Sequence, residues 1–134
     1  MADNGEDVAQ LLAFGVATPI AELGPELTES QKRVVRGEVT ITWPYNSVNK
    51  SLAFLLAEPD VRLRRAKGLI RVQLNGASAE AVAGCNLGGG DEVLLSLDGV
   101  GWEKDDAPAR PAGSRSDWQL KFSNKIILQV SYMT

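Results

Sequence analysis

The residues best suited to chemistry are cations clustered between residues 62 and 71. Five occur within ten positions, with no acidic residue among them: Arg62, Arg64, Arg65, Lys67 and Arg71. Basic side chains that neutralise phosphates release the counterions condensed on nucleic acid, which gives affinity independent of base sequence. The run therefore predicts contact with a phosphate backbone. The competing interpretation is a solvated, charged connection between two strands.

A second set of polar residues recurs at alternate positions of predicted strands. Side chains two apart in a strand share a face, and the set comprises Arg36, Thr40, Thr42, Arg71, Gln73 and Lys121. Arg and Gln can hydrogen-bond to the edges of unstacked bases. We expect this face to meet bases. An exposed sheet face without a ligand is the alternative.

Aromatic residues offer stacking surfaces. Tyr45 follows Pro44 in a predicted turn, so we expect an exposed ring, and one stacked base contributes roughly 1–3 kcal/mol. Half-buried packing at the rim of the domain is the competing interpretation. Trp102 lies in an acidic loop, where it would cap a base, dock on a partner or pack on its own chain. Alternation places Trp43 in the core. Lys50 completes the candidate nucleic-acid-binding set.

Catalysis finds little support in the sequence. There is no histidine, which removes the commonest general base, and Cys85 is the only cysteine. A zinc site of clustered Cys and His is therefore not available. The run Gly88-Gly89-Gly90 lacks the Gly-Lys-Ser/Thr ending of a phosphate-binding loop. We predict a protein that is not an enzyme and needs no metal or cofactor.

The composition is typical of a globular domain with an uneven charge distribution. The chain has 134 residues, 44% of them hydrophobic and 23% charged. Residues 1–31 contain six acidic residues and no Lys or Arg. Residues 32–134 therefore contain all 14 basic residues and the other 11 acidic residues. We predict an acidic leader followed by a mildly basic domain. No apolar run approaches a membrane span, no signal peptide is evident, and a single cysteine fits the cytosol or nucleus.

Five β-segments must position these residues. They are predicted at 34–43, 50–57, 69–75, 92–97 and from residue 118 to 130, with a kink at Asn124-Lys125. A short helix over 78–83 separates the third and fourth segments, and a short helical leader precedes the first. This order predicts an all-β fold, a five-stranded Greek-key OB-fold barrel, whose usual ligands are single-stranded nucleic acids or sugars. Ile20 and Leu23 are expected to dock the leader on the barrel.

Several short motifs add a resemblance to a known family. They are Thr18-Pro19-Ile20, Arg36-Gly37-Glu38-Val39, Trp43-Pro44-Tyr45, Ala57-Glu58-Pro59-Asp60 and Gly90-Asp91-Glu92-Val93. In order and spacing they resemble the N-terminal OB domain of telomere end-binding proteins, the protection-of-telomeres group, over residues 18–130. The resemblance implies binding of the single-stranded G-rich tail of chromosome ends, in the nucleus and without metal or cofactor.

Two departures from that family favour an alternative function. The connection between the first two strands is short, and residues 102–117 carry three basic and four acidic residues. Segment 50–57 is also apolar at its outward positions, Ala53, Leu55 and Ala57. Such a strip suits an interface. The alternative is an OB-fold that dimerises or docks another telomere-capping protein and binds little DNA itself.

Overall fold

A computed structural model describes residues 12–107 and 113–132. Residues 1–11 of the predicted acidic leader lie outside the described residues. The described chain forms strands β1 (Val16–Ala17), β2 (Arg33–Asn46), β3 (Ser51–Ala57), β4 (Leu69–Asn75), β5 (Glu92–Ser96), β6 (Gly101–Lys104), β7 (Trp118–Phe122) and β8 (Leu128–Ser131). The helical elements are a helical segment at residues 12–14, the 3₁₀ turns η1 (Ile20–Glu22) and η2 (Ser30–Lys32), and the helix α2 (Ala77–Ala83).

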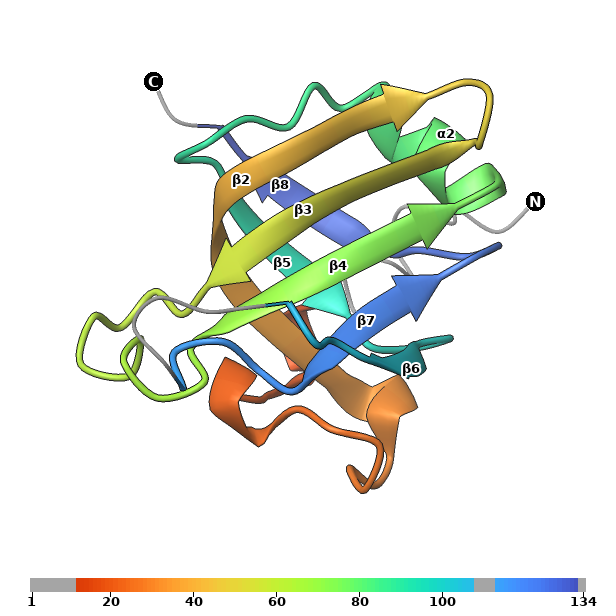
Figure 1. Cartoon of the computed structure of the whole chain (residues 1–134). Helices are drawn as coiled ribbons and strands as arrows, with labels where there is room; N and C mark the ends of the chain where they lie inside the picture. The colour runs from red at the N-terminus through yellow and green to blue at the C-terminus, as the bar shows by residue number, and fades with distance from the viewer. Residues whose placement is uncertain (1–11, 108–112, 133–134) are drawn as a thin grey trace.

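The strands form one strongly curved sheet in the order β6-β7-β4-β3-β2-β5-β8, with β1 parallel to β2 at one side (Figure 1). The pair β4–β7 is parallel, and the other pairs along this path are antiparallel. The helix α2 connects β4 to β5, as the sequence predicts. This is an all-β, OB-like arrangement.

The closed five-stranded barrel expected from the sequence needs correction. The hydrogen-bonded sheet is open, and the described residues contain eight strands. The predicted fifth strand is divided: β7 pairs with β4, and β8 pairs with β5. The break falls at the predicted kink. The predicted loop after β5 contributes the extra strand β6, which pairs with β7.

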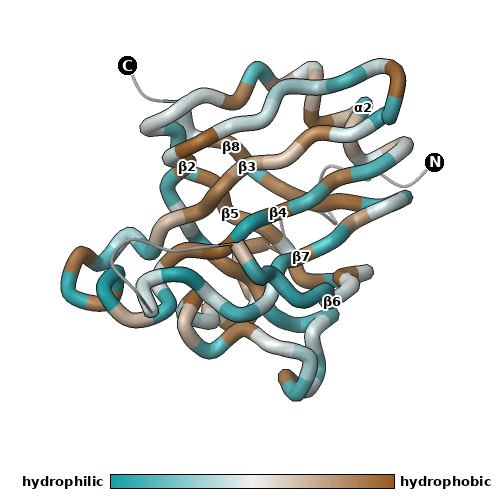
Figure 2. Tube along the Cα trace, in the orientation of Figure 1, coloured by the Kyte–Doolittle hydropathy of each residue, from teal (hydrophilic) through white to brown (hydrophobic). Residues whose placement is uncertain are grey.

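Alternating burial along the strands places the core on the inner face of the curved sheet. In β4, Ile70, Val72 and Leu74 are fully buried, and α2 covers one end of the core with Val82. Brown stretches on β3 and β5 mark the same apolar interior (Figure 2). Burying each large aliphatic side chain contributes about 1.5–3 kcal/mol. The leader residues Ile20 and Leu23 are also buried, which confirms that this segment docks on the sheet.

A bulge in β2 changes which side chains face outward. Val39 pairs with Leu56, but Ile41 pairs with Leu55, so two residues of β2 oppose one residue of β3. One extra residue reverses the inside–outside alternation from that point on. Ile41 and Trp43 therefore point outward and are 50% and 38% exposed. The prediction that Trp43 belongs to the core was wrong for this reason.

Candidate nucleic-acid interface

The outer surface of the sheet carries one row of residues across four strands. Trp43 of β2 is paired with Ala53 of β3, Ala53 with Gln73 of β4, and Gln73 with Lys121 of β7. Arg71 lies two residues before Gln73 and shares its face. We call Trp43, Arg71, Gln73, Asn75 and Lys121 the outer row. The register thus brings together three residues predicted for the site: Arg71, Gln73 and Lys121.

A cation–π contact crosses the middle of this surface. The guanidinium of Arg71 lies 4.4 Å from the centre of the Trp43 ring. Since β3 separates their strands, the contact crosses β3 diagonally, between Leu55, which is paired with Arg71, and Ala53, which is paired with Trp43 and is only 2% exposed. A small side chain at that position leaves room for the pair. The pair forms a flat, cationic platform of the kind on which bases stack.

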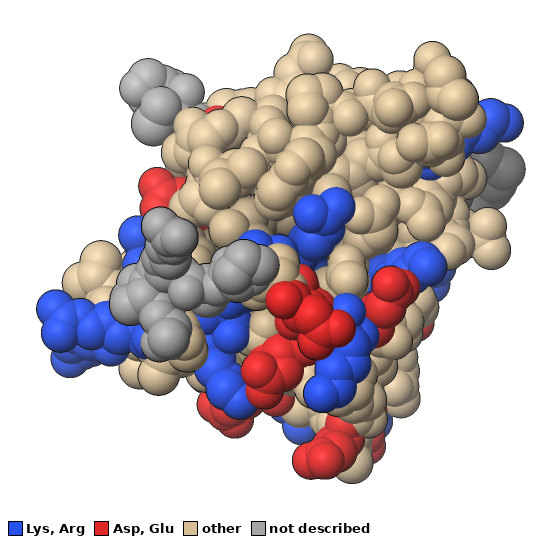
Figure 3. Space-filling view, in the orientation of Figure 1, with Lys and Arg blue, Asp and Glu red and all other residues tan. Residues whose placement is uncertain are grey.

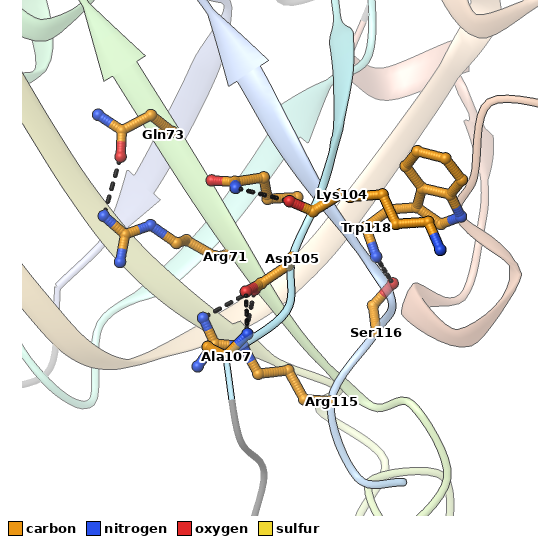
Figure 4. A network of polar contacts seen from close by, with 9 residues as sticks. Arg71, Gln73, Lys104, Asp105, Ala107, Arg115, Ser116 and Trp118 are labelled. Atoms are coloured by element: carbon orange, nitrogen blue, oxygen red, sulfur yellow. Dashed lines mark hydrogen bonds and ion pairs between the residues drawn. The ribbon is translucent and has the colours of Figure 1, made fainter.

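Polar contacts extend from the platform along β4. Nη2 of Arg71 donates to Oε1 of Gln73 at 2.9 Å, and Nε2 of Gln73 donates to Oδ1 of Asn75 at 2.9 Å. Figure 4 shows the first of these bonds. The contacts fix the side chains but use only part of their capacity, because the remaining Arg71 donors and the Asn75 amide stay available. Arg71 has no carboxylate ion pair within the described part of the chain.

Beside the outer row lies an open hollow of about 340 Å³. Its lining includes three cations (Arg71, Arg115 and Lys121) and two carboxylates (Glu103 and Asp105). Lys121 pairs with Glu103 at 3.2 Å, and Arg115 pairs with the nearly buried Asp105 at 2.8 Å (Figure 4). Figure 3 shows blue and red atoms intermingled over this region. The hollow is therefore of mixed charge, in keeping with the acidic loop noted in the sequence.

Apart from Arg71, which belongs to β4, the basic run lies in the connection between β3 and β4, where blue atoms gather at the left of Figure 3. Much of its charge is matched within the chain: Arg62 pairs with Asp60 at 2.9 Å, Arg64 with Glu38 at 2.7 Å, and Lys67 with Asp117 at 2.8 Å. The hydrogen bonds from Arg62 and Lys67 lower the pKa of Asp60 and Asp117, respectively. Arg64 also donates from Nε to the carbonyl oxygen of Glu58, so it has a structural role.

Within the run, Arg65 alone is exposed and without an ion pair among the described residues. Arg62 and Lys67 remain accessible, and exposed ion pairs contribute only about 0–1 kcal/mol. A phosphate can therefore replace their carboxylate partners at little cost. Arg65 and Arg71 are thus the cations of the run without an ion pair among the described residues, and Arg62 and Lys67 are weakly held.

The other predicted strand residues are dispersed. Arg36 pairs with Glu92 at 3.3 Å on the β5 side of β2. The hydroxyl of Thr40 donates to the carbonyl oxygen of Leu55 at the bulge, and Thr42 turns inward opposite Phe54. None of these three joins the outer row. Lys50 is exposed in the β2–β3 turn, and its carbonyl oxygen accepts a hydrogen bond from Gly76, just beyond Asn75.

The two aromatic residues chosen from the sequence do not provide the platform. Tyr45 is half-buried against the core, and burial, together with the charge of Glu80 and a hydrogen bond to it, raises its pKa. Trp102 lies opposite Leu120 in the β6–β7 pair and packs against the core. The exposed ring is that of Trp43, which sequence reasoning assigned to the core. Only the bulge turns it outward, and nothing in the alternation of residues marks that bulge.

The topology and the outer row define an OB-like domain with a polar sheet face. The chain belongs to the family described as a domain of unknown function (DUF8502), whose profile matches residues 14–134. No curated protein is similar to it in sequence. In the described residues, no helix has the length and apolar character needed to span a membrane.

Two crystal structures from fission yeast resemble this chain. The structure of Pot1 with ssDNA has a TM-score of 0.56 at 14% identity, over 98% of this chain and 46% of that one. The structure of Schizosaccharomyces pombe Pot1pC bound to ssDNA (CGGTTACGGT) has a TM-score of 0.49 at 13% identity, over 82% and 85%. The chain thus spans about half the length of the first protein. The first comparison shows that the two share a fold.

Proposed function

We propose that this protein binds single-stranded DNA on the outer row. The observation that carries the proposal is the Trp43–Arg71 platform, which continues into fixed polar side chains along β4. Two further points support it. OB-folds commonly bind oligonucleotides on this part of the barrel, and the fold is shared with Pot1, which was crystallised with ssDNA.

Each part of the interface has a distinct role in this proposal. A base stacks on the guanidinium of Arg71, which the ring of Trp43 supports from below. Gln73 and Asn75 offer donors and acceptors to the edges of the next base, because both side chains follow Arg71 on the same face of β4. Lys121 within the row, Lys50 in the β2–β3 turn and Arg65 in the β3–β4 connection attract the phosphates. Binding needs no bond to be broken, so the proposed activity is non-catalytic and requires no cofactor.

The specific ligand we propose is the G-rich overhang of telomeres, and the site of action is the chromosome end in the nucleus. The support is the order of short motifs over residues 18–130, together with the shared fold. Arg71 adds a chemical reason, because a guanidinium can donate to both O6 and N7 of guanine.

The alternative function, a protein-docking or dimerisation module, relied on an exposed apolar strip on segment 50–57. The strip proposed as an interface comprises Ala53, Leu55 and Ala57, and these residues are only 2%, 5% and 1% exposed. The chain itself covers them. The outer surface next to this strip presents the platform, polar groups and the half-exposed side chain of Ile41.

The test is a titration of the full chain against a labelled G-rich repeat strand, followed by fluorescence anisotropy. A scrambled single strand and a duplex of the same length serve as controls, at low and near-physiological salt. Preference for the repeat strand that survives the higher salt supports the telomeric proposal. Equal binding of the scrambled strand reduces the claim to general single-strand binding. Absence of binding to both single strands would exclude the proposed function.

A further inference from the structure

A small pocket lies at the rim of the sheet, next to the platform but on the other side of β2. It is bounded by the end of β2, by β3 and by α2, which sits beside the β2–β3 turn in Figure 1. Its volume is about 150 Å³, and much of its wall is apolar, including Leu52, Phe54, Val82 and Leu87. An apolar cavity of roughly 150 Å³ accepts one benzene ring. The pocket therefore has the size of a single six-membered ring.

Two polar side chains in the pocket have unused hydrogen-bonding capacity. Neither the hydroxyl of Thr42 nor the carboxamide of Asn86 has a hydrogen-bond partner within residues 12–107 and 113–132, and both residues line the pocket. Thr42 points inward because the bulge in β2 reverses the alternation at this point. Asn86 has a left-handed backbone, with φ of 52°. A few polar groups in an otherwise apolar pocket are typical of a ligand site.

Trp43 connects this pocket to the outer row. The residue whose ring supports Arg71 is also one of the residues that line the pocket, so Trp43 borders both the platform and the pocket. Tyr45 also lines the pocket. A nucleotide adjacent to the stacked base can thus turn its base over the rim of β2.

We infer that this rim pocket binds one pyrimidine base of the single strand. The inference rests on the proposed function, since the strand must lie on the outer row to deliver the base. The size selects one ring, whereas a purine has two fused rings. Thr42 and Asn86 can each donate and accept a hydrogen bond, which matches the carbonyl oxygens and N3 of a pyrimidine edge.

The test compares two variants that add the same atoms to one helix. Ala83→Leu places a larger side chain in the pocket, and Ala81→Leu places it on the exposed face of α2. Affinity is measured for a set of single strands in which each base in turn is removed or exchanged between pyrimidine and purine. Wild type and Ala81→Leu should show one position where loss of the base, or a purine, weakens binding roughly tenfold. In Ala83→Leu that position should become insensitive.

Two further variants protect the test against misfolding of Ala83→Leu. Thr42→Val keeps the shape of the side chain, and Asn86→Gly suits the left-handed backbone; each should weaken the preference at the same position. The inference is overturned if wild type binds the strands but shows no such position, or if Ala83→Leu keeps the wild-type profile. Failure of every single strand to bind wild type would instead reject the proposed function, and this inference with it.

A titration with free nucleosides tests the pocket without DNA bound on the outer row. Thymidine or cytidine is added to the full chain, and the methyl resonances of Val82 and Leu87 are followed by NMR. Shifts in wild type that disappear in Ala83→Leu support the inference. If N-acetyltyrosinamide shifts these methyl groups and neither nucleoside does, the pocket accepts an aromatic side chain of a protein partner, and the inference is wrong.

Discussion

The guanidinium of Arg71 lies over the ring of Trp43 at 4.4 Å, although a whole strand separates β4 from β2. The contact depends on two features of the chain. The bulge between Val39 and Ile41 turns Trp43 outward, and the small side chain of Ala53 leaves space above β3. The platform is therefore a consequence of sheet register rather than of residues close together in sequence.

Replacement of Trp43 or Arg71 by Ala should weaken single-strand binding about tenfold each, or roughly 1.4 kcal/mol. Since the two side chains act as one platform, the double variant should lose less than the sum of the two effects. Anisotropy titrations of the four proteins provide this cycle. Lys32→Ala is the matched control, because it removes a cation paired with Glu29 in η2, away from the outer row. Additive losses would mean that the contact does not serve binding.

Two neighbouring arginines of the basic run should behave differently. Arg64→Ala should lower the free energy of unfolding by about 1 kcal/mol, because it removes a contact to Glu38 and a bond to the Glu58 carbonyl. Arg65→Ala should leave stability unchanged but reduce the salt dependence of binding, by about 0.7 in logarithmic slope for one phosphate. Urea unfolding and titrations at several salt concentrations measure the two effects. The reverse pattern would contradict the assigned roles.

Gly37 allows β2 to approach β3 closely. A Cβ at this position would lie 3.0 Å from Cβ of Leu56, so Gly37→Ala should destabilise the fold by roughly 1–3 kcal/mol. Gly84→Ala is the control, since its Cβ would meet the nearest atom at 3.7 Å and its backbone is helical. Chemical denaturation should show no loss of stability in this control. Equal stability of the two variants would show that the strands do not approach so closely.

The ionisation of Tyr45 reports the packing of the rim. Burial raises its pKa above the ordinary value of 10.0, and Glu80 raises it further. Because the folded state favours the neutral phenol, this stabilisation is fully present below pH about 10 and is lost as the pH rises further. Absorbance at alkaline pH should show the raised pKa in wild type and a smaller rise in Glu80→Gln. A Tyr45 pKa at its ordinary value would mean that the ring is solvated.

The sequence predicts the fold best where a strand keeps a strict alternation, as β4 does. Ile70, Val72 and Leu74 alternate with polar residues and are buried as predicted, and the helix after β4 lies between Gly76 and Gly84. The polar residues of β4 also fall on the predicted face. In β4 the alternation of residue types agrees with the alternation of burial, so the local sequence pattern is sufficient to predict which side chains face the core.

The platform and the ion pairs depend on relationships that local pattern does not contain. One extra residue in β2 moves Trp43 from the core to the surface, and only the pairing with β3 reveals it. Lys67 pairs with Asp117, which is 50 residues away in the chain. The sequence alone therefore does not show that this cation of the basic run has an acidic partner. Long-range pairing decides both features.

The most direct test of the central claim is a ¹H–¹⁵N NMR titration of the full chain with a short G-rich single strand. The account predicts that the shifted amides cluster on the outward positions of β2 to β4 and β7, around Trp43, Arg71 and Gln73, with the Trp43 indole signal among the largest changes. Shifts centred on β5 and β8, or confined to the connection between β3 and β4, would contradict it.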